Sequence, residues 1–354
     1  MKKIDVMIVD DSAVFRKFLN DAVERTNSAR VQASVANGMA CLEYLKQNKV
    51  DVVLLDVHMP DINGIDVLRE IKEKYEDTKV IMISSAGDDN VALTVEALEM
   101  GALDFISKPK GDDPEKNMFR ISSYLKVIFN HIAINKFYKP VSGVSIAEDK
   151  NQKTQNKALK SKIDLVLIAS STGGPKALYE VCGKLPSDLE VPVLIVQHMP
   201  AEFTAIFSKS LNNISKLEVF EAKEGDMPSA GTIYVAKGGS HMILTKSASN
   251  EMVIKMEDTP TVNGVRPAAD VLFKSVADNF PNLNILVVVL TGMGKDGTEG
   301  LRQIKAKGKC YAITQNEKTC AVYGMPKSAY EAGLSDEVTA IEEIADSIIR
   351  KVRN

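Results

Sequence analysis

The sequence predicts an α/β protein of two domains, each built on a mostly parallel sheet and joined to the other by a polar linker. Short apolar runs such as Ile4–Val9 and Ile163–Ile168 are typical of parallel strands buried on both faces. Apolar residues at helical spacing follow several of these runs, and a polar stretch at 136–161 interrupts the alternation. A chain of 354 residues is long enough for about two such cores.

Two predicted strands end in carboxylates. Ile4–Val9 is followed by Asp10 and Asp11, and Val50–Leu55 is followed by Asp56. In an open parallel sheet, ligands bind just beyond the carboxyl ends of the strands, so we expect these three carboxylates in one crevice. Their mutual repulsion calls for a cation, and hard oxygen ligands suit Mg²⁺.

Two further predicted strands bring a hydroxyl and an ammonium group to the same edge. Lys79–Ile83 ends in Ser84, and Ala102–Ser107 ends in Lys108. Taken alone, an Asp after a strand is more often a turn or helix-capping residue than a nucleophile. The whole set favours acceptance of a phosphoryl group: Asp56 would be the nucleophile and Mg²⁺ would neutralise charge, while Lys108 and Ser84 would contact the new oxygens.

With these motifs, residues 1–135 resemble a response-regulator receiver domain. The resemblance implies a flavodoxin-like fold with a five-stranded parallel sheet. It also implies phosphorylation of Asp56 by a histidine kinase, Mg²⁺ held by Asp10, Asp11 and Asp56, and support of the phosphoryl site by Ser84 and Lys108.

The composition disfavours several classes of protein. The formal net charge is −3 and charged residues make up 26%, so no strongly basic surface favours nucleic acid. No apolar stretch approaches the ~18 residues of a membrane span, and the N-terminus lacks a signal-peptide core. The four cysteines show no CxxC or zinc-type spacing, which indicates buried free thiols in a reducing compartment. We therefore expect a cytoplasmic protein.

A domain boundary is expected at 136–161. This segment holds Lys139–Pro140 and the polar run Ala147–Lys157, with few apolar residues and no periodicity. Such a composition is typical of a flexible polar linker. The predicted domains are therefore 1–135 and 162–354.

The second domain opens with a strand that ends in a turn of small residues. Ile163–Ile168 leads into Ser170–Pro175, and a helical pattern follows. A glycine-rich turn of this kind could cradle a phosphate, although it matches neither GxGxxG nor GxxxxGK[ST]. Alternatively, a serine at its tip is a nucleophile whose oxyanion is stabilised by N–H groups at the helix start. The turn by itself leaves both interpretations open.

A serine nucleophile needs a base, and the chain offers four histidines. His198 follows the predicted strand Val191–Gln197 at the same sheet edge as the serine turn, which makes it the strongest candidate. His58 flanks the first crevice, and His131 is expected to be a surface or packing residue. His241 follows a glycine turn and is kept as a candidate pocket-lining residue.

A third polar group follows the predicted strand Asn284–Leu290. The loop Thr291–Gly297 is rich in glycine, which lets the backbone approach another group closely. Asp296 lies in this loop and is expected to open the next helix, so helix capping is one interpretation. As the orienter of His198, it would instead fix the imidazole tautomer and stabilise the imidazolium. Along the chain the three candidates come in the order Ser, His, Asp. This differs from the chain orders of three known classes of serine hydrolase, so we expect a fold of separate evolutionary origin.

Several motifs follow one another as in the CheB family of protein-glutamate methylesterases: Ser171–Gly174, Gln197–Pro200, Arg266–Pro267, Leu290–Gly297, Gln315–Glu317 and Gly324–Pro326. The resemblance implies a doubly wound, mostly parallel α/β domain and a triad of Ser171, His198 and Asp296. It places the Met293 backbone N–H in the oxyanion hole and Thr172 at the oxyanion or substrate site. One departure is Ala169–Ser170, where the family commonly has Gly-Ala; alignment on the following residues selects Ser171.

The resemblance further implies hydrolysis of glutamyl methyl esters on methyl-accepting chemoreceptors by the Ser171 hydroxyl, without a cofactor. Deamidation of specific receptor glutamines follows from the same chemistry. A chemotaxis histidine kinase would be the phosphodonor, and no nucleic acid or membrane insertion is involved. Phosphorylated Asp56 would then bias the equilibrium between the domains and control access to Ser171.

Two other classes of protein compete with this interpretation. A receiver-driven transcription factor is disfavoured because the chain lacks a short basic helix-turn-helix pattern. A non-catalytic receptor-binding adaptor stays open on sequence alone, because the presence of three candidate residues does not demonstrate turnover.

Overall fold

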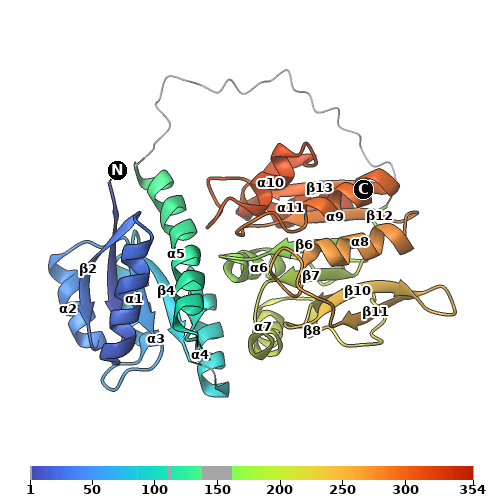
Figure 1. The fold of residues 1–354 in the computed structure, drawn as a ribbon. Coiled ribbons are helices and arrows are strands. Elements are labelled where there is room, and N and C mark those ends of the chain that lie inside the picture. The colour runs from blue at the N-terminus through green and yellow to red at the C-terminus, as the bar shows by residue number, and fades with distance from the viewer. Residues whose placement is uncertain (1, 86, 110–112, 138–161, 354) are drawn as a thin grey trace, which may run out of the picture. The chain divides into compact units, whose positions relative to one another are not determined.

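The computed structural model describes residues 2–85, 87–109, 113–137 and 162–353. The chain forms two compact units, Met1–Lys150 and Asn151–Asn354, called here the N-terminal and C-terminal units (Figure 1). The linker predicted at 136–161 lies outside the described residues except for Lys136 and Phe137, which continue the last helix of the N-terminal unit. No helix within the described ranges is long and apolar enough to cross a membrane.

The N-terminal unit contains a five-stranded sheet in the order β2-β1-β3-β4-β5. All neighbouring strands pair in parallel, as predicted. The order reverses between β1 and β3, so the crevice beyond the carboxyl ends of these two strands is the expected ligand site. The strands are β1 Ile4–Val9, β2 Ala29–Val35, β3 Val52–Asp56, β4 Lys79–Ser84 and β5 Asp104–Ser107.

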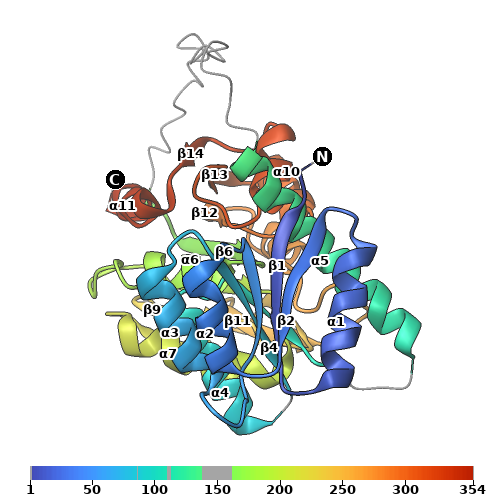
Figure 2. The same ribbon diagram turned by 90° about the vertical axis from the view of Figure 1, so that its left-hand side faces the viewer.

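Helices cover both faces of this sheet. Figure 2 shows α1 and α5 on one side of the strands and α2 and α3 on the other. Polar side chains fix several helix starts, because Ser12, Asn37 and Asn63 each accept a backbone N–H from the first turn. The helices are α1 Ala13–Arg25, α2 Gly38–Gln47, α3 Gly64–Lys74, α4 Asp88–Glu99 and α5 Pro114–Phe137.

The C-terminal unit contains a seven-stranded sheet in the order β14-β13-β12-β6-β7-β9-β8 and a separate hairpin, β10-β11. Every pair in the larger sheet is parallel, whereas the hairpin is antiparallel. The strands are β6 Leu165–Ser170, β7 Val193–Gln197, β8 Glu218–Glu221, β9 Thr232–Val235, β10 His241–Lys246, β11 Met252–Glu257, β12 Asn284–Val289, β13 Lys309–Gln315 and β14 Glu337–Thr339.

The central strand of this sheet is β6, which pairs with β7 on one side and β12 on the other. The chain winds outward from β6 in one direction and later returns to add β12 on the other side, so a switch point lies between β6 and β12. The carboxyl ends of β12, β6 and β7 therefore meet at one edge. The predicted doubly wound, mostly parallel fold is confirmed.

The helices of the C-terminal unit form two packed groups: α6 contacts α7 and α11, whereas α9 contacts α8 and α10. Alternate residues of β6, Leu165, Leu167 and Ala169, belong to the core that also contains Phe273 of α8. The helices are α6 Gly174–Cys182, α7 Ala201–Ile214, α8 Ala269–Asn279, α9 Thr298–Lys307, α10 Met325–Glu331 and α11 Ile341–Arg353.

The packing of α8 against α9 generates a stability prediction at Gly300. A Cβ atom there would lie 2.5 Å from Phe273 Cβ and 3.0 Å from the Asp270 carbonyl oxygen. Gly300→Ala gains about 1 kcal/mol of helix propensity, but overpacking costs about 1–3 kcal/mol. We therefore expect a lower unfolding temperature of the C-terminal unit, measured by calorimetry on the full chain.

The matched control for this prediction is Ala306→Gly, at an exposed position of the same helix. This substitution measures the same difference in helix propensity in the opposite direction, and it should destabilise the C-terminal unit by about 1 kcal/mol. A Gly300→Ala protein that unfolds at a higher temperature than the wild type would show that α8 and α9 are not closely packed.

Candidate active site and acidic crevice

The structure brings together the carboxylates predicted in the N-terminal unit. Oxygen atoms of Asp10, Asp11 and Asp56 lie within 4.8 Å of one another. Asp10 and Asp56 are buried, and Asp11 is exposed. Lys108 Nζ lies 2.8 Å from Asp10 Oδ2 and 2.9 Å from Asp56 Oδ2. It donates a hydrogen bond to Asp56 and forms an ion pair with Asp10.

Burial dominates the electrostatics of this crevice. It raises the pKa of Asp56 to about 6, because the loss of hydration outweighs the hydrogen bond and charge of Lys108. Burial also acts to lower the pKa of Lys108, but the two carboxylates outweigh it and that pKa is raised. One ammonium group shared between two buried carboxylates therefore leaves Asp56 incompletely compensated.

Ser84 occupies the neighbouring strand end, as predicted. Asp56 pairs with Ile83 in the β3–β4 ladder, so Ser84 follows directly at the same edge. Its carbonyl oxygen accepts the Lys108 backbone N–H at 2.7 Å, and its hydroxyl oxygen lies 2.7 Å from Thr94 Oγ1. Ser84 thus helps to hold both the backbone of Lys108 and helix α4, to which Thr94 belongs.

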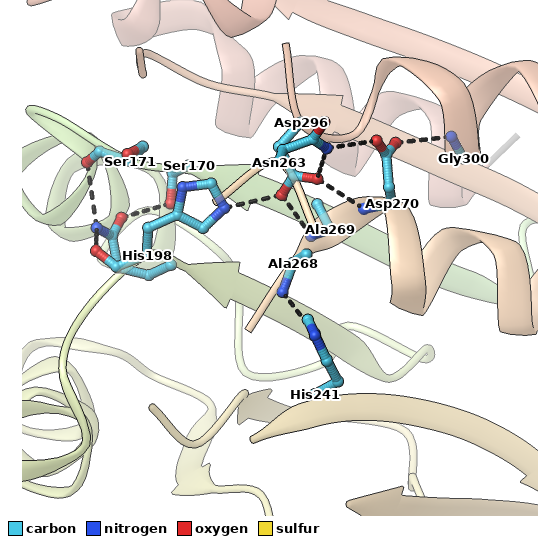
Figure 3. A network of polar contacts seen from close by, with 11 residues as sticks. Ser170, Ser171, His198, His241, Asn263, Ala268, Ala269, Asp270, Asp296 and Gly300 are labelled. Carbon is cyan, nitrogen blue, oxygen red and sulfur yellow. Dashed lines mark hydrogen bonds and ion pairs between the residues drawn. The ribbon is translucent and has the colours of Figure 1, made fainter. Parts of the chain in front are cut away.

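In the C-terminal unit, His198 and Asp296 are in direct contact (Figure 3). His198 Nε2 lies 2.8 Å from Asp296 Oδ2, although the residues come from the ends of different strands. The side chain of Asp296 is 2% exposed and that of His198 is 10% exposed. The contact places a hydrogen on Nε2 when the imidazole is neutral, which leaves Nδ1 as the acceptor.

Backbone groups from another helix hold the Asp296 carboxylate. It accepts the N–H of Ala269 at 2.6 Å and of Asp270 at 3.1 Å, both at the start of α8, and the Asn263 amide at 2.9 Å. Burial alone would raise the pKa of Asp296. The contact with His198 and these donors outweigh burial, so the pKa is lowered and the group stays anionic.

This arrangement corrects one expectation about Asp296. The helix predicted to begin there, α9, begins at Thr298 after Gly297, whose φ of 87° is left-handed, and no side chain caps it. Asp296 instead accepts N–H groups at the start of α8, a helix that precedes it in the sequence. The carboxylate thus caps one helix and contacts His198 at the same time.

The two adjacent serines have different environments. Ser170 is fully buried, and its hydroxyl donates to Gln197 Oε1 at 2.7 Å. Ser171 is partly exposed at the turn before α6. No hydrogen bond joins Ser171 Oγ to His198 among the described residues. Such bonds are often long without substrate and tighten on binding.

Close backbone approach brings the loop after β12 to the serine turn. A Cβ atom on Gly292 would lie 2.8 Å from Ser171 Cβ, and the Ser171 N–H donates to the Thr291 carbonyl at 3.0 Å. Thr172 is buried, and its carbonyl accepts the Thr291 hydroxyl. Met293 follows Gly292 in the same loop. Within the described part of the chain, no group accepts the N–H of Thr172 or Met293.

His241, the candidate pocket-lining residue, has both ring nitrogens in contact with the backbone. It is fully buried, its Nδ1 accepts the Ala268 N–H at 3.1 Å, and its Nε2 lies 3.1 Å from the Pro260 carbonyl oxygen. Packing of the β10-β11 hairpin against α8 places it next to Ala268, on the side of the α8 start away from Gly300 (Figure 3). Its contact with Ala268 fixes the start of the helix that holds Asp296.

Two contributors to the site were missed in the sequence. Gln197 donates to the carbonyls of both Ser171 and His198. Asn263 lies in a tight turn closed by Val262 and Val265, with a φ of 55°, and donates to Asp296. The pair Asn263–Gly264 is a turn signal in the sequence, and a glutamine at the end of an apolar strand is unusual. Neither pattern shows which residue the side chain contacts.

The folds and sites define a receiver-type unit joined to an α/β unit with a Ser-, His- and Asp-bearing sheet edge. Residues 166–348 match the family model described as CheB methylesterase, and residues 6–118 match the response regulator receiver domain. The chain therefore belongs to the CheB methylesterase family and carries an N-terminal receiver domain.

Curated relatives match along the whole chain. A protein-glutamate methylesterase/protein-glutamine glutaminase of Clostridium acetobutylicum is 40% identical over 354 residues, covering 100% of this chain and 99% of that one. The Bacillus subtilis protein of that name is 38% identical over 359 residues, covering 99% of each. Among solved structures, the catalytic domain of Thermotoga maritima CheB methylesterase has a TM-score of 0.51 and 36% identity, and covers 54% of this chain and 99% of that one.

The acidic crevice generates a prediction about pH and stability. Asp56 has a folded-state pKa of about 6, above the ~3.9 of an unfolded Asp. The folded state therefore binds this proton more tightly, and the stability of the N-terminal unit falls as pH rises from about 4 to about 6. Lys108→Met removes the compensating charge, so the fall should become larger and extend to higher pH.

Calorimetry of the full chain at several pH values between about 4 and about 8 checks this. Asp56→Asn is the matched control, because it removes the titrating group and should flatten the same part of the curve. A Lys108→Met protein whose unfolding temperature varies with pH no more than that of Asp56→Asn would contradict the prediction.

Proposed function

We propose that the chain is a phosphorylation-regulated protein-glutamate methylesterase of chemotactic adaptation. It hydrolyses glutamyl methyl esters on methyl-accepting chemoreceptors to glutamate and methanol, and it deamidates specific receptor glutamines. The observation that carries the proposal is the buried His198–Asp296 contact beside Ser171 at one sheet edge. The full-length relatives named methylesterase and glutaminase support the substrate class.

In this mechanism Ser171 is the nucleophile. Its Oγ attacks the ester carbonyl while His198 Nδ1 takes the hydroxyl proton, and Asp296 holds the ring through Nε2 and stabilises the imidazolium. The proton then passes to the leaving methoxide, and methanol departs. Water attacks the acyl-enzyme with His198 again as base, which releases the glutamate carboxylate and restores the serine.

Backbone N–H groups stabilise the tetrahedral oxyanion in this proposal. Met293 and Thr172 flank Ser171, and their N–H groups have no acceptor within the described residues. A single donor of this kind is worth about 3–4 kcal/mol in a measured example. A glutamine side chain differs from the ester mainly in its poorer leaving group, so the same site supports deamidation.

The acidic crevice is the input site in this proposal. Asp56 accepts a phosphoryl group from a chemotaxis histidine kinase, and Lys108 and Ser84 contact the new oxygens. Asp10, Asp11 and Asp56 fit a Mg²⁺ ion because their oxygens converge and Lys108 alone leaves Asp56 under-compensated. Bound there, Mg²⁺ would neutralise the charge that develops on the phosphoryl oxygens.

The phosphoryl group controls the esterase in this account. It adds about two negative charges and can bias the equilibrium between states of the two units. A tenfold change in the active population needs only about 1.4 kcal/mol. We place the protein in the cytoplasm, which its four free cysteines support.

Serine substitutions test the proposed reaction. Ser171→Ala should lower methanol release from methylated receptor membranes by at least about 10⁴-fold, because the attacking oxygen is lost. Ser170→Ala should retain clearly measurable turnover, because the Ser170 hydroxyl is buried and engaged by Gln197. Equal activity of Ser171→Ala and the wild type would reject Ser171 as the nucleophile.

Phosphodonor treatment tests the input site. A small phosphodonor with Mg²⁺ should accelerate methanol release by the wild type. Removal of Mg²⁺ by a chelator should abolish that acceleration, because charge on the incoming phosphoryl group would be left uncompensated. Asp56→Ala should keep its basal rate of methanol release, and that rate should not change when the phosphodonor is added. If Asp56→Ala responds as the wild type does, another group receives the signal.

A further inference from the structure

The buried amide of Gln197 lies between the two residues proposed for catalysis. Gln197 is 2% exposed and ends β7 directly before His198. Its Nε2 donates to the Ser171 carbonyl at 3.1 Å and to the His198 carbonyl at 3.0 Å. Both N–H bonds of one planar amide are therefore used on the backbones of the nucleophile and its base.

This amide begins where the sheet stops. The β6–β7 ladder ends at the pair Ser170 and Gln197, and the last ladder bond runs from the His198 N–H to the Ser170 carbonyl. Ser171 and His198 each follow the last residue of their strand, where the strand pairing has ended and no ladder bond uses their carbonyl groups. The Gln197 side chain links the two backbones at that point in place of a ladder bond.

Ser170 completes the arrangement. Its hydroxyl donates to Gln197 Oε1 at 2.7 Å, and Ser170 is fully buried. A Cβ atom on Gly174 would lie 2.0 Å from the same Oε1, so only glycine leaves room for the amide there. If the amide were turned over, Oε1 would face the carbonyl oxygens of Ser171 and His198, and all three are acceptors. The Ser170 hydroxyl and these two carbonyls therefore favour the same orientation of the amide.

We propose that Ser170 and Gln197 form a positioning pair that fixes the separation of Ser171 and His198 for proton transfer. This inference rests on the proposed function and adds two residues to it. Neither side chain contacts the reacting atoms. Ser170 acts only through Gln197, because its hydroxyl satisfies an amide oxygen that would otherwise be buried without a partner.

The proposal is tested with Ser170→Ala, Gln197→Met and the double variant. A shift of about 1 Å in a reacting group can cost about a hundredfold in rate. We expect Ser170→Ala to lower kcat about tenfold and Gln197→Met about a hundredfold, with KM within about twofold of wild type. The double variant should match Gln197→Met, because Ser170 has no separate route to the catalytic residues.

Ser208→Ala is the matched control. Ser208 is 2% exposed, belongs to α7 of the same unit and donates its hydroxyl to the Thr204 carbonyl at 2.7 Å. The substitution removes the same atom and a comparable hydrogen bond, without a link to Gln197. Its kcat should equal the wild-type value. The thermal unfolding of each variant shows whether a loss of kcat merely reflects a smaller fraction of folded protein.

A second readout does not need the receptor substrate. Phenylmethylsulfonyl fluoride forms a covalent bond with an activated serine oxygen and releases fluoride, and mass spectrometry follows the labelling of Ser171. The labelling rate should fall in Ser170→Ala by about the same factor as kcat and stay unchanged in Ser208→Ala. If Gln197→Met does not fold, Ser170→Ala alone decides the outcome.

The outcomes separate the two proposals. If the wild type releases methanol and Ser170→Ala matches Ser208→Ala in kcat and labelling, the positioning pair is rejected and the proposed function stands. If Ser170→Ala changes KM but not kcat, the pair is also rejected. If the wild type releases no methanol but Ser170→Ala slows labelling, the proposed function fails and the positioning pair stands.

Discussion

Parallel pairing of β12, β6 and β7 is the constraint on which the candidate active site depends. Because the three strands run in one direction, their carboxyl ends meet at one edge and bring together loops that are far apart in sequence. Pairing alone does not place the side chains, since the ladder ends before Ser171 and His198. Beyond it, the backbone contact at Gly292 and the buried amide of Gln197 set the geometry.

Two aspartates at strand ends show how their surroundings select their chemistry. Asp296 is buried but accepts several N–H donors and contacts His198, so its pKa is lowered. Asp56 is buried with a lysine that it shares with Asp10, so its pKa is raised to about 6. The first suits a permanent anion that orients an imidazole. The second is a carboxylate whose surroundings need further positive charge, which fits a cation-assisted phosphoryl acceptor.

The hydrogen bonds at the candidate catalytic edge bear on how the proposed regulation would act. Its residues are tied by buried hydrogen bonds among Ser170, Gln197 and the neighbouring backbones, and by the donors around Asp296. Distorting such a network leaves buried polar groups unsatisfied at about 1–3 kcal/mol each. A change in access to the edge needs only about 1.4 kcal/mol for a tenfold effect. In the regulation proposed above, control of access to the edge is therefore favoured over distortion of the arrangement of Ser171, His198 and Asp296.

The strands that carry the two sites, their polar ends and the two-unit organisation follow from the sequence alone, because apolar runs that end in polar residues are local patterns. The polar ends of neighbouring strands indicated His198 and Asp296 as candidates, and the family resemblance selected Ser171. Tertiary contacts alone establish that Ser170 is buried, that His241 is buried against the start of α8, and that Asp296 caps α8 rather than α9. These outcomes depend on distances between residues from different strands and helices, which no local pattern encodes.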